Sequence, residues 1–134
     1  MNTQLHKLQP YVLSIARIAI AFMFMQHGTA KLLGIPHVEM FDGLQLFSLY
    51  GIAGLLEMVG GGLLLLGLFT RPVAFILSGM MAVAYFMGHA IPNGSVLVPF
   101  MNGGEPAALF SFIFLYFSVA GGGSFALENK LFKK

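Results

Sequence analysis

The residues of this chain that could do chemistry are a few polar side chains set within or beside long apolar segments. Glu57 is the only ionisable residue between Gly54 and Leu68, and Arg17 interrupts an earlier apolar run. A charge inside a membrane is costly, so it normally faces the protein interior and finds a partner there. The residues of this kind form a candidate polar, ligand-binding cluster: Arg17, His27, Lys31, Glu57, His89, Asn102 and Glu105.

The residue types also restrict which chemistry is possible. The chain has no cysteine, which excludes disulfides, thiol catalysis and Cys-ligated metal clusters. No metal site is expected, and no residue can be assigned a catalytic role from its spacing. The formal net charge of +2 rests on few basic residues, so nucleic acid is not expected as a partner.

Four apolar segments must position these residues, at about 11–33, 48–68, 72–91 and 106–121. At about 1.5 Å per residue, the first three match a hydrocarbon layer of about 30 Å, and the fourth is slightly short. The chain is 57% hydrophobic and only 9% charged, whereas a soluble domain carries about 25% charged residues. Glycines are frequent in the 48–68 segment, where they would let neighbouring helices approach closely.

These features predict an all-α fold, a four-helix transmembrane bundle with short loops that forms a single domain over residues 1–134. A Pro/Gly-rich outer loop precedes the 106–121 segment, and a short amphipathic tail ends the chain. The bilayer is therefore the first expected partner.

The distribution of charge predicts the orientation. Four spans place both termini on one side, which carries the basic residues Lys7, Arg71, Lys130, Lys133 and Lys134. The opposite side carries Lys31, Glu39, Asp42 and Glu105. By the positive-inside rule, both termini are expected in the cytoplasm.

This orientation allows the depth of each polar residue to be compared. Arg17 falls about 9 Å inside the cytoplasmic boundary and Glu57 near the membrane centre, a difference of roughly 7 Å. We therefore expect Arg17 to pair with Glu57. His27 and His89 fall at nearly equal depth on the outer side, and Lys31 lies one helical turn above His27. The 11–33 segment would then carry a polar stripe that leads from an outer cluster down to Glu57.

Each of these residues also has a purely structural interpretation. An Arg17–Glu57 pair could simply fix the register of two helices. His27 and His89 could be solvated by water among the lipid headgroups, and Lys31 could anchor its helix by extending to the interface. The sequence leaves these alternatives open.

Several motifs occur in a characteristic order along the chain. They are "RIAIAFMFMQHGTAKL" (17–32), "GIAGLLEMVGGGLLLLGLFTRPVA" (51–74), "NGGEPAALF" (102–110) and "GGGSFAL" (121–127). Together they resemble the DoxX family of small bacterial integral membrane proteins. The positions that match the motifs are Arg17, Gly28, Lys31, Glu57, Asn102, Gly103, Gly104 and Glu105. The chain departs from the family at the last motif, where it reads "GGG" and "ALE". The resemblance therefore implies no role for Glu128, the acidic residue of "ALE".

The resemblance implies a multi-pass protein of the bacterial cytoplasmic (inner) membrane with a link to redox chemistry, because related proteins form the membrane subunit of thiosulfate:quinone oxidoreductases. We therefore favour a membrane subunit or partner of a quinone-linked oxidoreductase. A quinone needs an apolar slot, donors for its carbonyl oxygens and a proton route. His27, Lys31 and His89 could be the donors, and Glu57 or Glu105 could carry protons. With no flavin motif, no intrinsic cofactor is expected, and an oxidoreductase subunit would supply the electrons.

Three alternatives come from other functional classes. The protein could be a non-enzymatic membrane anchor or assembly factor. It could be a small transporter of protons or anions that is gated by an Arg17–Glu57 pair. A haem held by His27 and His89 is the least favoured possibility. Whether the chain is an enzyme, and whether it forms a homo-oligomer, remains open at this level.

Overall fold

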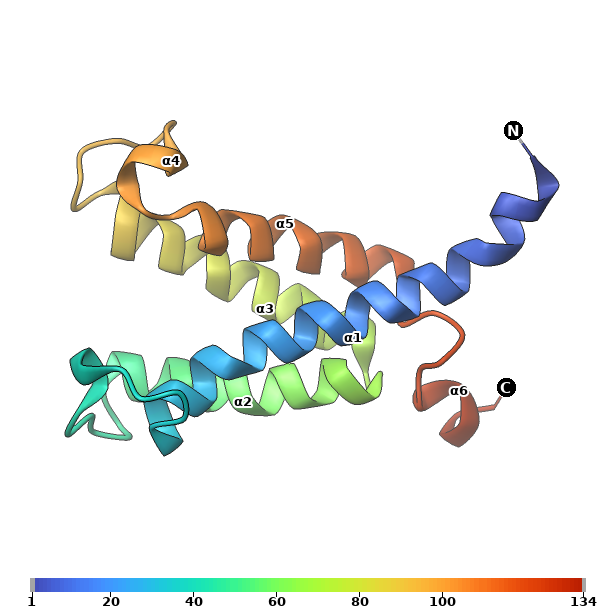
Figure 1. Ribbon diagram of the computed structural model, residues 1–134, viewed down its shortest axis with the longest axis horizontal. Coiled ribbons are helices and arrows are strands. Elements are labelled where there is room, and N and C mark those ends of the chain that lie inside the picture. The colour runs from blue at the N-terminus through green and yellow to red at the C-terminus, as the bar shows by residue number, and fades with distance from the viewer. Residues whose placement is uncertain (1, 134) are drawn as a thin grey trace. The chain divides into compact units, whose positions relative to one another are not determined.

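The computed structural model describes residues 2–133, and within that range the regular structure is entirely helical (Figure 1). The long helices are α1 (Thr3–Leu33), α2 (Leu49–Leu66), α3 (Thr70–Tyr85) and α5 (Glu105–Ala120). Short elements lie between and after them: η1 (Glu39–Phe41), the π-helix η2 (Phe86–Ala90), α4 (Pro99–Asn102) and α6 (Glu128–Leu131). The prediction of an all-α fold is confirmed.

Within residues 2–133, three helical stretches are long and apolar enough to cross a membrane, namely Thr3–Leu33, Leu49–Leu66 and Thr70–Ala90. The apolar helix α5 is shorter, at 16 residues. The predicted limits agree with these helices to within a few residues, except at the start of α1. That helix begins at Thr3 rather than near residue 11. A helix can extend beyond its apolar part, because each added residue forms one more backbone hydrogen bond. The predicted amphipathic tail contains α6, and its last residue, Lys134, lies outside the described residues.

The chain divides into two compact units. One unit contains α1, α2 and the C-terminal segment from Gly121 onward, and the other runs from Arg71 to Ala120. Each unit has its own packing and its own polar groups.

In the first unit, α1 and α2 lie side by side and run in opposite directions (Figure 1). The buried residues Ser14, Arg17, Ala21, Phe24 and Gly28 recur along α1 at alternating spacings of three and four, so one stripe faces inward. A Cβ on Gly28 would lie 2.7 Å from the Gly54 carbonyl oxygen and 2.7 Å from the Met58 amide nitrogen. The two backbones can therefore approach this closely only because residue 28 has no side chain.

In the second unit, α3 and α5 pack in antiparallel directions. The Ser78 hydroxyl donates to the Ser111 carbonyl oxygen at 2.7 Å, and the Ser111 hydroxyl donates to the Ser78 carbonyl oxygen at 2.9 Å. At one end of this pair, the Arg71 guanidinium donates to the Val119 carbonyl oxygen. These side-chain bonds tie the two helices together where apolar packing alone would not specify their register.

Candidate functional site

The central feature of the first unit is a buried ion pair between Lys31 of α1 and Glu57 of α2. The Lys31 Nζ atom lies 2.7 Å from both Oε1 and Oε2 of Glu57. The exposed fractions of the two side chains are 11% and 6%. Glu57 therefore faces the protein interior, as its position in an apolar segment predicted.

The direction of the side chains explains why these two residues meet. Side chains on a helix lean toward the N-terminus of that helix. Because α1 and α2 are antiparallel, Lys31 leans away from the end of α1 and Glu57 leans back toward the start of α2, so the two converge. Between them, an added Cβ on Gly54 would lie 3.0 Å from the Lys31 Cβ, so the glycine leaves room for the lysine stem.

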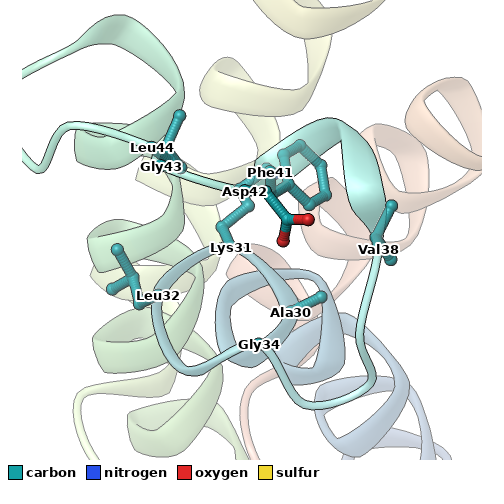
Figure 2. A pocket seen from close by; sticks show the side chains of 9 residues that line it. All are labelled: Ala30, Lys31, Leu32, Gly34, Val38, Phe41, Asp42, Gly43 and Leu44. Carbon is teal, nitrogen blue, oxygen red and sulfur yellow. The ribbon is translucent and has the colours of Figure 1, made fainter.

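A pocket of about 220 Å³ lies beside this pair (Figure 2). It is formed where the segment after α1 folds back over the last turn of that helix, and Lys31, Phe41 and Asp42 all line it. The Lys31 ammonium lies 5.6 Å from the centre of the Phe41 ring, close enough for a cation–π interaction. At the exposed rim, His37 Nε2 lies 2.9 Å from Asp42 Oδ1. The pocket thus combines a cation, an aromatic face and a carboxylate.

The predicted pairing of Arg17 with Glu57 is wrong. Arg17 is fully buried and donates through Nε to the Gly122 carbonyl oxygen at 2.8 Å. Its Nη1 donates to the carbonyl oxygens of Leu64 and Leu65, the latter at 2.7 Å. These carbonyls belong to the last turn of α2, where the helix dipole favours a cation, and the Leu64 carbonyl oxygen also accepts from the Gly67 amide at 3.2 Å.

The register of the two helices is the physical reason for this difference. Gly28 packs against Gly54 and Met58, so Glu57 lies at the level of Gly28. Eleven residues separate Gly28 from Arg17, a distance of about 16 Å along a helix, rather than the expected 7 Å. The guanidinium cannot span that distance.

The continuous polar stripe expected on α1 is also absent. Ala21 and Phe24, both fully buried, lie between Arg17 and Gly28 on the inward face. The unit therefore has two polar centres separated by an apolar section. A transport gate built on an Arg17–Glu57 pair has no counterpart in this arrangement.

Two residues that were not among the predicted candidates, Ser14 and Glu128, complete the polar centre around Arg17. The Ser14 hydroxyl bonds to the carbonyl oxygens of Pro10 and Gly122 and accepts from the Phe125 amide at 2.9 Å. Glu128 Oε2 accepts from the Thr70 amide at 3.0 Å, at the start of α3. Ser14 could have been found from its spacing of three residues from Arg17, whereas nothing in the local sequence connects Glu128 to Thr70.

In the second unit, Asn102 organises the segment before α5. It is 5% exposed, and its Nδ2 donates to the Tyr85 hydroxyl at 3.0 Å and to the Ser95 carbonyl oxygen at 2.7 Å. Its Oδ1 accepts from the Gly104 amide at 2.8 Å. His89 Nδ1 lies 3.3 Å from the Asn102 carbonyl oxygen. These contacts hold a loop together and leave the side chain of Asn102 no free polar atom directed at a ligand.

The remaining predicted residues lie at the surface. His27 is exposed on α1, and Glu105 is exposed at the first position of α5. Among residues 2–133, no three His, Cys, Asp or Glu side chains come together as a metal site. Of the seven candidates, then, the structure pairs Lys31 with Glu57 and brings His89 against Asn102.

Comparison with known proteins gives two matches. The sequence model of the DoxX family matches residues 12–90, a range that includes Arg17, Lys31, Glu57 and His89. The chain is also 49% identical over 132 residues to an uncharacterized protein of Haemophilus influenzae. That alignment covers 97% of this chain and 98% of the relative. No solved structure matches the chain.

Proposed function

The chain belongs to the DoxX family of membrane proteins, and from this premise we propose that it is the quinone-docking membrane subunit of an oxidoreductase. The observation that supports the proposal is the buried Lys31–Glu57 pair beside a pocket lined by Phe41 and Asp42. In this role the protein would bind and orient a quinone, while a partner protein would supply electrons.

The groups around the pocket suit a quinone headgroup. An ammonium has three N–H donors, and Glu57 engages Lys31 through two carboxylate oxygens. A further donor can then bond a quinone carbonyl oxygen, and hydrogen bonds from charged donors are the stronger ones. The Phe41 ring offers an apolar face for the ring of the ligand. Glu57 or Asp42 would exchange the protons that quinone reduction consumes.

Electrons would have to come from another protein, because the sequence lacks the residues that bind an iron–sulfur cluster. The 134 residues contain no cysteine, so no Cys-ligated cluster can be built from them. We further propose that the helices form a four-helix bundle in the bacterial cytoplasmic membrane with both termini in the cytoplasm. The basic residues Lys7, Arg71, Lys130 and Lys133 support that orientation.

Binding of decylubiquinone to the protein in lipid nanodiscs tests this proposal. The wild-type protein should bind the quinone saturably by calorimetry. Lys31→Met should weaken binding roughly tenfold or more, which corresponds to loss of one charge-assisted hydrogen bond of about 1.5–3 kcal/mol. Lys130→Met, at an exposed position of α6, is the matched control and should leave binding unchanged.

Lys31→Met leaves Glu57 unpaired and could misfold, so a second variant provides an independent test. Phe41→Ala removes the ring face without removing a charge, and it should also weaken binding. Absence of saturable binding by the wild-type protein would refute the proposal. If the protein then co-purified from membranes with an oxidoreductase, the anchor or assembly function would be preferred.

A further inference from the structure

The segment between η2 and α5 has a composition unlike that of a water-facing loop. From residue 90 to residue 104 the chain carries no Asp, Glu, Lys or Arg. Three of its large apolar side chains are strongly exposed: Leu97 at 91%, Phe100 at 79% and Met101 at 72%. Clusters of exposed apolar side chains mark a contact surface, because water solvates them poorly.

Two polar side chains that hold this segment, Asn102 within it and Tyr85 at the end of α3, are turned inward. Asn102 and Tyr85 are buried, and they donate to the Ser95 and Val96 carbonyl oxygens, each at 2.7 Å. A soluble loop has the opposite arrangement, with apolar groups inside and polar groups outside.

Much of the backbone of this segment is also hydrogen-bonded internally. The amides of Gly94 and Ser95 donate to the carbonyls of Ile91 and Ala90, each at 3.1 Å. The Met101 amide donates to the Val98 carbonyl oxygen at 2.9 Å, within the short helix α4. Non-helical backbone near a bilayer needs partners of this kind, because lipid tails provide none.

We propose that residues 91–102 form a membrane-inserting element whose Leu97, Phe100 and Met101 side chains enter the lipid at the boundary between headgroups and acyl tails. The lipid, rather than a protein, is the occupant because the segment directly continues α3–η2, a stretch long and apolar enough to span the bilayer. It leads into the apolar helix α5 at its other end. In this role Asn102 shapes the element, independently of any quinone.

Because the chain has no cysteine, single-cysteine variants with a spin label provide a clean test. Leu97→Cys, Phe100→Cys and Met101→Cys would each be labelled in phosphatidylcholine vesicles. Relaxation of the label by oxygen, which partitions into lipid, is then compared with relaxation by a water-soluble nickel chelate. Leu109→Cys, at an exposed apolar position of α5, serves as the lipid reference, and Lys130→Cys serves as the water reference.

The three labels should show an oxygen-to-nickel ratio close to that of Leu109→Cys and well above that of Lys130→Cys. The ratio should not change when anionic phosphatidylglycerol is added, because the segment carries no basic residue to attract it. Labels as accessible to nickel as the water reference would overturn the proposal. So would labels protected from both reagents, since a protein partner or a second copy would then cover the segment. Retained helical content by circular dichroism confirms that each variant is folded.

Discussion

At the scale of single residues, the Lys31–Glu57 pair is two charges that have lost their hydration and that lie in direct contact with each other. Burying two charges among apolar groups requires their mutual attraction to offset the loss of hydration. The ammonium meets both carboxylate oxygens at 2.7 Å, which is the geometry in which that attraction is strongest. The attraction therefore offsets the loss of hydration only while both partners are present.

A double-mutant cycle on this pair should reveal strong coupling. Glu57→Gln and Lys31→Met each leave one buried charge without its partner, and each should reduce the free energy of unfolding by about 3 kcal/mol or more. The double variant should lose much less than the sum, because no unpaired charge remains. Unfolding in mixed micelles with increasing dodecyl sulfate, followed by circular dichroism, measures these differences.

Asp42→Asn is the matched control for that cycle. It removes the charge of an exposed pair with His37, and such surface pairs contribute about 0–1 kcal/mol. Losses that simply add in the Lys31–Glu57 double variant would contradict the coupling and the burial on which the proposed site depends.

The residue scale also shows where sequence reasoning reaches its limit. The burial of Glu57 could be predicted, because a carboxylate in an apolar segment has few other stable positions. Its partner could not be predicted from depth alone, since a small error in where each helix begins moves every residue along it. The choice of Lys31 over Arg17 depends on the packing register and on the lean of side chains along each helix.

At the scale of helices, α1 contacts α2 through a stripe whose middle is apolar and whose ends are polar. Gly28 sets the closest approach at the Lys31–Glu57 end. Arg17 and Ser14 bind the C-terminal segment at the other end. The ion pair therefore depends on a backbone separation that only glycine at position 28 permits.

Gly28→Ala should accordingly destabilise the protein and disturb the pair. Its Cβ would meet backbone atoms of Gly54 and Met58 at 2.7 Å, so α1 and α2 must move apart. Strain of this kind typically costs about 1–3 kcal/mol. Gly79→Ala in α3 is the matched control, because an added Cβ there meets no atom within 4 Å.

The two variants should therefore shift stability in opposite directions. Replacing an unhindered helical glycine by alanine stabilises a helix by about 0.5–1 kcal/mol. The same mixed-micelle unfolding measurement applies to both. A Gly28→Ala variant as stable as Gly79→Ala would show that α1 and α2 do not approach as closely as the structure indicates.

The C-terminal segment shows which element-level features the sequence hides. The sequence predicted glycines that close the last apolar helix, followed only by a short amphipathic tail. In the structure, the Leu127 and Glu128 amides donate to the carbonyls of Leu66 and Gly67, each at 3.0 Å. The segment thereby caps the end of α2, and the Glu128 carboxylate caps the start of α3. Contacts between positions so far apart in sequence follow from tertiary packing and leave no local pattern.

At the scale of the whole molecule, composition and hydropathy predicted most of the helices. The apolar runs lack the polar/apolar alternation of a membrane β-strand and therefore favour helices, so the positions of α2 and α5 followed within a few residues. The division into two compact units did not follow from any sequence signal. The polar network around Asn102 could not be predicted from the sequence either. The contact between Tyr85 and Asn102 depends on the conformation of the loop between them.

The orientation in the membrane is the prediction that tests the whole arrangement, including whether α5 crosses. It has 16 residues, about 24 Å of helix, against a hydrocarbon layer of about 30 Å. We expect it to span, with local thinning of the bilayer compensating for the mismatch. A fusion of green fluorescent protein to the C-terminus should then fluoresce, because that reporter folds in the cytoplasm.

Alkaline phosphatase, which is active only outside the cytoplasm, provides the complementary measurement. Fused after Gly43 or after Asn102, in the two loops expected outside, it should be active. Fused after Phe69, between α2 and α3, it should be inactive. Activity after Asn102 together with a dark C-terminal fluorescent fusion would mean that α5 fails to cross. The chain would then have three spans with its termini on opposite sides, and the basic residues near its C-terminus would face away from the cytoplasm.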